Sequence, residues 1–171
     1  MGQAFTPMKY GSAWIGTQES RGPWRYCGEG DLGMCAITRT ASTILAQDPL
    51  FGWTLYGGNL QESSDGFRFV PEDGVERVLY LISEKQRVGL SINRGHWSES
   101  VPVFISKNLR TVQTTIRTEG KSVELTFERL KGEGAPTLRA NGTRLQPTID
   151  KYGRYVYQLP QSDEVKVEVR M

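Results

Sequence analysis

Histidine, cysteine and long apolar runs are scarce in this 171-residue sequence. One histidine (His96) and two cysteines (Cys27 and Cys35) cannot form an ordinary zinc site without help from carboxylates, so we expect no metal site and no cofactor. No window approaches the roughly 18 apolar residues that a membrane-spanning helix needs, so we expect no contact with a membrane. Basic residues number 21 and acidic residues 19, and this near balance argues against nucleic acid as a partner.

The remaining composition is that of a globular domain. Hydrophobic residues make up 37% of the chain and charged residues 23%, and this length is enough to bury a core. Residues 1–10 contain one lysine and no apolar run, so they do not have the pattern of a secretory signal peptide. Cys27 and Cys35 are eight positions apart, a spacing that favours free thiols over a disulfide.

Glycine and aromatic residues are abundant but unevenly placed. Residues 1–60 hold ten of the 19 glycines, eight of the 17 aromatic residues and only eight of the 40 charged residues. Residues 1–30 have no hydrophobic period, so we expect an irregular segment that packs on the domain or on a partner. Residues 31–171 are expected to form one domain.

The stretch after residue 30 is the one place where apolar residues recur with helical spacing. Asp31 suits an N-cap, and Asp48-Pro49 favours a stop. The pattern therefore predicts one helix over about residues 31–47, with apolar positions at Met34, Ile37, Ala41, Ile44 and Leu45.

From residue 50 onward the hydrophobic period changes to two, which predicts strands. Pro102 suggests that the strand near residues 101–106 lies at a sheet edge, and Asn141-Gly142 is a hairpin turn signal, although Asn141 also begins a glycosylation sequon. About eight to ten short strands separated by frequent turns predict a mostly β fold, an antiparallel β-sandwich. The stretches that show an alternating or extended pattern are 51–56, 67–70, 75–82, 87–93, 101–106, 109–118, 123–127, 137–140, 143–145, 155–159 and 165–169.

The densest group of chemically useful residues is the glycine-rich loop at 24–33. Aromatic rings stack on sugar faces and paired carboxylates can serve as acid and base, so Glu29 and Asp31 are the candidate catalytic residues if the chain is an enzyme. The competing interpretation, which we favour for the loop itself, is that Asp31 only caps the helix and the glycines only turn the chain. The candidate ligand-binding residues are Trp14, Trp24, Arg25 and Tyr26.

Other residues that could carry chemistry have structural interpretations. Trp53 alternates with Leu55 and is expected in the core, and a single histidine such as His96 is more often a structural hydrogen-bonding residue. Phosphate-loop, dinucleotide-binding and hydrolase-elbow patterns are absent. The basic residues of the last 41 positions are expected to form a solvated face; they include Arg139, Arg144, Lys151 and Arg154.

One stretch resembles a known arrangement. Residues 48–58 follow the pattern Asp-Pro-x-Phe-Gly-Trp-x-x-Tyr-Gly-Gly, which resembles the junction between the last toroid helix and the C-terminal β-sandwich in large, mostly uncharacterised bacterial and fungal glycosidase-like (α/α)-toroid proteins. Residues 71–92 are similar to an early hairpin of that sandwich and residues 153–159 to its last strands, so the likeness covers about residues 24–170. It implies carbohydrate handling and a secreted or periplasmic location. This chain has no toroid, so of the candidate acids only Glu29 and Asp31 could reach such a cleft.

Three hypotheses follow. The favoured one is a non-catalytic β-sandwich module of a carbohydrate-active system, which binds saccharide or docks to a helical partner domain. The alternatives are a glycosidase-like hydrolase that uses Glu29 and Asp31 in a site shared between chains, and a homo-oligomeric assembly domain. The absence of a second carboxylate cluster, a metal site or a catalytic triad favours the module.

Overall fold

The computed structural model describes residues 42–48, 52–56, 59–70, 78–83, 86–130 and 132–171. These residues form strands and turns, and no helix lies among them. Accordingly, no helix in the described ranges is long and apolar enough to span a membrane. Fifteen strands lie in these ranges: β1 (Ser42–Asp48), β2 (Gly52–Tyr56), β3 (Gln61–Glu62), β4 (Gly66–Phe69), β5 (Val78–Ile82), β6 (Arg87–Asn93), β7 (His96–Trp97), β8 (Val103–Ser106), β9 (Thr111–Arg117), β10 (Glu124–Glu128), β11 (Thr137–Ala140), β12 (Thr143–Leu145), β13 (Thr148–Ile149), β14 (Tyr155–Gln158) and β15 (Glu164–Arg170).

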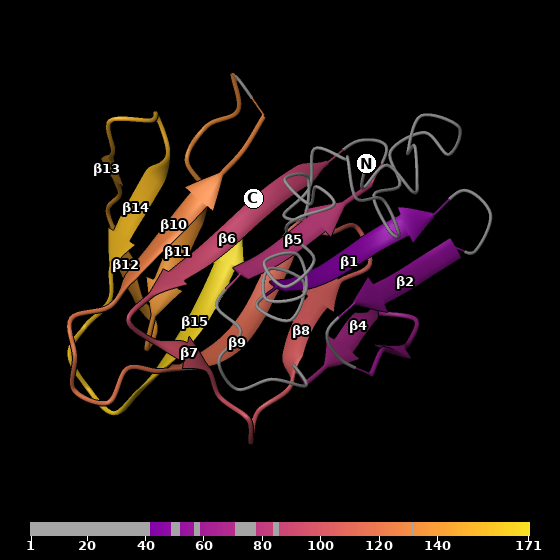
Figure 1. Ribbon diagram of the computed structural model, residues 1–171, viewed down its shortest axis with the longest axis horizontal. Helices are drawn as coiled ribbons and strands as arrows, with labels where there is room; N and C mark the ends of the chain where they lie inside the picture. Colours follow the sequence, from indigo (N-terminus) through magenta and orange to yellow (C-terminus); the bar gives the residue numbers. More distant parts are fainter. Residues whose placement is uncertain (1–41, 49–51, 57–58, 71–77, 84–85, 131) are drawn as a thin grey trace, which may run out of the picture.

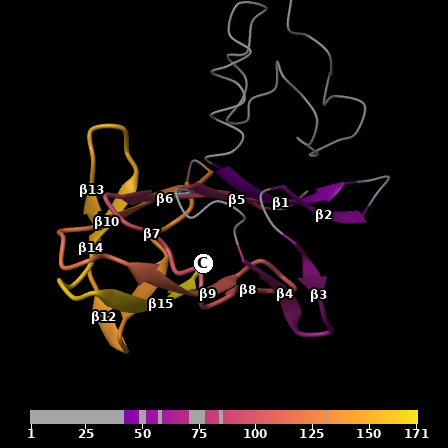
Figure 2. The same cartoon turned by 60° about the horizontal axis from the view of Figure 1, so that its bottom comes forward.

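The strands form two sheets packed as layers (Figures 1 and 2). The seven-stranded sheet has the order β13-β14-β10-β6-β5-β1-β2, and the eight-stranded sheet has the order β12-β11-β15-β9-β8-β4-β3, with β7 paired to β9. Among the described strand pairs, β1 and β5 are parallel and the others antiparallel. The mostly β, sandwich-like fold predicted from the alternating pattern is confirmed.

The core lies between the two sheets. Alternate residues of each strand point inward, as the pleat requires, and Phe127 packs edge-on against Tyr157 with ring centroids 5.6 Å apart. The predicted inward set of the strand at 109–118 is confirmed, because Val112, Thr114 and Ile116 are buried on β9 while Gln113 and Arg117 are exposed; Thr115, on the outward side, is also buried. Trp53 packs half-buried against this core, as expected, with its ring 4.7 Å from that of Phe67.

The helix expected over residues 31–47 is wrong for residues 42–47. Residues 42–48 form β1, which lies inside the seven-stranded sheet between β2 and β5. Four successive residues of this strand, Thr43 to Ala46, are buried, so both faces are covered and the sequence lacks the alternation of a half-exposed strand. Asp48, expected at the end of a helix, is instead the last residue of a strand, and Pro49 lies outside the described ranges. Residues 31–41 lie outside the described ranges, as does the irregular segment 1–30.

The edge position expected for the strand near Pro102 is also wrong. Val103 to Ser106 form β8, which is paired on one side with β4 and on the other with β9. Pro102 immediately precedes the strand, so its missing N–H falls outside the ladder. The hairpin expected at Asn141-Gly142 is confirmed: both residues have positive φ (49° and 84°) and connect β11 to β12.

Candidate functional site

The outer face of the eight-stranded sheet carries a continuous row of side chains across six strands. In the register, each residue of the row lies opposite the next on the neighbouring strand. Neighbouring strands are about 4.8 Å apart, so the row is a straight line across the sheet and not along it. Its members, from β4 through β8, β9, β15 and β11 to β12, are Arg68, Phe104, Gln113, Glu168, Arg139 and Arg144.

A shallow hollow of about 530 Å³ lies over the middle of this row. Its apolar side is formed by Val101, Pro102 and Phe104, of which Val101 is exposed and Phe104 half-buried. Its polar side is formed by the side chains of Gln113 and Thr115 on β9, Arg139 on β11, and Lys166 and Glu168 on β15. The hollow thus combines an aromatic ring with amide, hydroxyl and cationic groups, which can contact both the apolar and the hydroxyl-bearing faces of a ligand.

Gly66 allows the aromatic end of the row to pack closely. A Cβ at this position would lie 2.2 Å from the carbonyl oxygen of Ile105 and 2.9 Å from Cε2 of Phe104. The Phe104 ring therefore approaches the backbone of β4 at a point where only glycine leaves room.

Arg68 is held over the Phe104 ring. Its guanidinium carbon lies 4.6 Å from the ring centroid, a cation–π contact, and its two terminal nitrogens donate to the two carboxylate oxygens of Asp65 at 3.2 and 2.8 Å. The hydrogen bond from Arg68, with another from Ser63, holds the pKa of Asp65 well below its usual range. Because the guanidinium is fixed on two sides, Arg68 is an ordered part of the sheet face.

The cations at the other end of the row and beside it on β15 differ in whether they form ion pairs. Arg170 donates to Glu168 at 2.7 Å, so this carboxylate is neutralised within β15. Arg139, Arg144 and Lys166 are exposed, and within the described part of the chain no ion pair or side-chain hydrogen bond engages their charged groups. The β11–β15 end of the face therefore carries uncompensated positive charge.

Two other hollows each include polar side chains that already bond to one another or to the backbone. One, of about 750 Å³, includes Trp53 and Gln86, whose side-chain amide donates to the carbonyl of Leu109 at 2.7 Å, and an Arg129–Glu133 ion pair at 3.2 Å. The other, of about 530 Å³, includes Glu119, which pairs with Lys121 at 2.5 Å and with His96 at 3.5 Å. These contacts stabilise neighbouring loops, so we assign both hollows a structural role.

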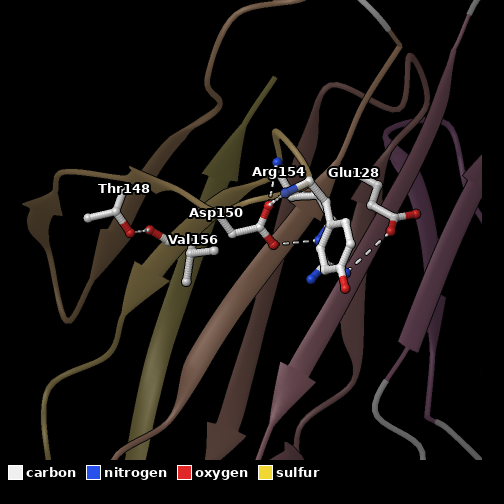
Figure 3. Close-up of polar contacts among 6 residues, drawn as sticks. Glu128, Thr148, Asp150, Arg154 and Val156 are labelled. Carbon is white, nitrogen blue, oxygen red and sulfur yellow. Dashed lines mark hydrogen bonds and ion pairs between the residues drawn. The ribbon is translucent and has the colours of Figure 1, made fainter.

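The hairpin from β13 to β14 is ordered by a single carboxylate (Figure 3). Asp150 accepts hydrogen bonds from the N–H groups of Tyr152 and Arg154 and from Nε of Arg154, and Arg154 also reaches Glu128 at 3.5 Å. Burial would raise the pKa of Asp150, but the hydrogen bonds from Arg154 and Tyr152 outweigh it and lower the pKa. The Tyr152 ring, 70% exposed, carries Lys151 and Arg154 at 4.9 and 5.1 Å from its centroid.

The residues predicted from sequence as the site lie outside the described ranges, and they stay predictions. They are the candidate acids Glu29 and Asp31 and the candidate ligand-binding residues Trp14, Trp24, Arg25 and Tyr26. The sequence reasoning placed Arg139 and Arg144 on a solvated face, and both are exposed, but it did not single out Phe104, Gln113 or Lys166. The sequence indicated only that these residues occupy outward-facing positions of the predicted strands, a property that many other residues share.

Within the described ranges, no three His, Cys, Asp or Glu side chains are grouped so that they could hold a metal ion. Comparison of the chain with protein families, with characterised proteins and with solved structures gives no match. The function must therefore be argued from the sheet face itself.

Proposed function

We propose that this chain is a non-catalytic β-sandwich module that binds saccharide on the outer face of its eight-stranded sheet. The observation that carries the proposal is the row from Arg68 to Arg144 with the hollow above it. A sheet is rigid, so side chains at fixed register positions present a preorganised surface, which reduces the entropy lost when a ligand binds.

The chemistry of the hollow suits a sugar. A pyranose ring has an apolar face, which can pack on Phe104 and Val101, and equatorial hydroxyls, which can exchange hydrogen bonds with the exposed amide of Gln113. The hollow is shallow and lies on a sheet face, a shape that accepts part of a long polymer more readily than a small enclosed ligand.

The same chemistry favours binding over hydrolysis at this face. Glycoside hydrolysis normally requires two carboxyl groups about 5–10 Å apart on either side of the scissile bond. Among the described residues that border the hollow, Glu168 is the one carboxylate, and it is paired with Arg170. The hydrolase hypothesis therefore depends on Glu29 and Asp31.

Affinity electrophoresis of the full chain through gels containing soluble polysaccharides tests the proposal. We expect at least one neutral or acidic polysaccharide to retard the wild-type chain, and Phe104→Ala or Gln113→Ala to reduce the retardation. Gln161→Ala is the matched control, because Gln161 is exposed and does not border the hollow. Retardation that neither sheet-face variant reduces, or no retardation in any gel, would contradict the proposal; circular dichroism establishes that each variant is folded.

One observation favours homo-oligomeric assembly as a second candidate function. Ile149 and Tyr152 are 67% and 70% exposed, and both lie at the short edge strand β13 or the turn that follows it. An exposed apolar pair beside an unprotected edge is a common contact between chains. Sedimentation velocity would show a concentration-dependent dimer that Ile149→Lys abolishes; a monomer at all concentrations would exclude this candidate.

A further inference from the structure

Two arginines face one another on the outer surface of the sheet, and neither forms an ion pair within the described ranges. Arg139 on β11 lies directly opposite Arg144 on β12. Like charges in this position repel one another and destabilise the hairpin. Two other cations of this sheet face are paired: Arg68 with Asp65, and Arg170 with Glu168.

A third cation adds to this pair. Lys166 lies on β15 two residues from Glu168, so both side chains point to the same face, and both Lys166 and Arg139 border the hollow. Glu168, the carboxylate opposite Arg139, is already engaged by Arg170. The three cations therefore attract an anionic ligand. An anionic group that belongs to a bound ligand stabilises them more than a free anion in the solvent does.

We infer that the saccharide bound by this face is an acidic polysaccharide. Its carboxylate or sulfate groups pair with Arg139, Arg144 and Lys166, while the apolar side of a sugar ring packs on Phe104. Guanidinium groups suit this role because their planar fork matches the two oxygens of a carboxylate or sulfate. The inference rests on the proposed function and specifies its ligand.

The register also gives the direction of the polymer. The aromatic and the cationic ends belong to one row, which crosses the strands at about 4.8 Å per strand. This step is comparable with the length of one sugar residue, so a polymer lying along the row places successive acidic groups opposite Arg139 and Arg144 on the adjacent strands β11 and β12. An acidic polymer is favoured over nucleic acid because, among the described residues that border the hollow, Phe104 is the one aromatic residue, and Arg68 already covers its ring on one side; nucleic acid binding typically uses a series of rings on which bases stack.

Binding measured by isothermal titration calorimetry on the full 171-residue chain tests the inference with two matched pairs of polymers. Polygalacturonate is compared with its carboxyl-reduced form, and dextran sulfate with dextran, so the pair that shows the preference identifies the acidic group. We expect the acidic member of at least one pair to bind about tenfold or more tightly than its neutral counterpart, the gain typical of one or more charge-assisted hydrogen bonds.

Charge variants locate the effect. Arg139→Gln and Arg144→Gln should each weaken binding of the acidic polymer about tenfold. Arg110→Gln is the matched control, since Arg110 is also exposed and its guanidinium has no ion-pair partner in the described ranges, but it borders a different hollow. An equal loss in this control would show that overall charge alone is responsible and would overturn the inference.

The remaining outcomes separate the inference from the proposed function. Equal affinity for the acidic and neutral members of both pairs overturns the inference and leaves saccharide binding intact. No binding to either acidic polymer also overturns it, and the polysaccharide gels then decide the proposed function alone. Tighter binding of a single-stranded oligonucleotide of equal charge would show that the ligand class is wrong.

Discussion

Replacing Gly66 with alanine tests the packing on which the sheet face depends. The new Cβ would lie 2.2 Å from the carbonyl oxygen of Ile105, a backbone atom of the paired strand β8, and 2.9 Å from the Phe104 ring. A side chain could rotate away from such a contact, but a backbone carbonyl in the middle of a ladder cannot, so β4 and β8 must separate. Overpacking of this kind costs about 1–3 kcal/mol, and the involvement of backbone favours the upper end.

The matched control is Gly134→Ala. Gly134 has no atom within 4 Å of the position its Cβ would occupy and no positive φ, so the identical substitution meets open space. We expect this variant to stay within about 0.5 kcal/mol of the wild type or to gain slightly from reduced freedom of the unfolded chain.

Urea unfolding followed by circular dichroism measures both variants against the wild type. A loss of about 2–3 kcal/mol in Gly66→Ala corresponds to a fall in Tm of about 4–12 °C for a chain of this length. A free energy of unfolding within about 0.5 kcal/mol of the wild type would refute the close approach of β4, β8 and the Phe104 ring.

Three further predictions concern single residues. Arg144→Gln removes the repulsion from Arg139, so it should raise the free energy of unfolding by about 0.2–1 kcal/mol in low salt while weakening the binding of acidic polymers; a loss of stability would contradict this. The pKa of Asp150 is lowered in the fold, so its hydrogen bonds stabilise the fold fully above the unfolded pKa of about 3.9, and this stabilisation is lost as pH falls through the lower folded pKa. The free energy of unfolding of the wild type and of Asp150→Asn, measured with urea, should therefore differ less at pH 2 than at pH 7. A difference that stays constant with pH would contradict this prediction. Tyr157 is fully buried and donates to the carbonyl of Pro136, so Tyr157→Phe should cost about 1 kcal/mol of unfolding free energy, and no cost would show that this hydrogen bond is unimportant.

The alternating strands could be predicted from sequence because one face of each is buried and the other solvated. On β15 the apolar residues Val165, Val167 and Val169 fall at every second position, and only one register places them all in the core. The hairpin turn at Asn141-Gly142 could also be predicted from sequence, since both residues adopt positive φ at low energetic cost.

The interior strand β1 could not be predicted in the same way. Thr43 to Ala46 are buried on both faces, so the information that separates a strand from a helix, the period of exposure, is absent from this stretch. The pairing of β1 with β5 is parallel and joins residues 42–46 to residues 78–82. No local sequence pattern predicts a contact between segments so far apart.

The candidate site is a product of register. Phe104, Gln113, Glu168 and Arg139 are dispersed over more than sixty positions and become neighbours only because β8, β9, β15 and β11 lie side by side. The sequence could indicate that Arg139 and Arg144 are exposed, and the hairpin signal could place them opposite one another. It could not indicate that Phe104 and Lys166 lie on the same surface, which requires the sheet order.

The most direct test of saccharide binding by the sheet face is its location by nuclear magnetic resonance. A ¹⁵N-labelled full chain titrated with oligogalacturonides should show amide shift changes that cluster on β8, β9, β11 and β15, with the largest around Gln113, Arg139 and Lys166. Changes confined to residues 14–31, where Trp24, Glu29 and Asp31 lie, or around Trp53, would show that the sugar binds elsewhere and would contradict the account.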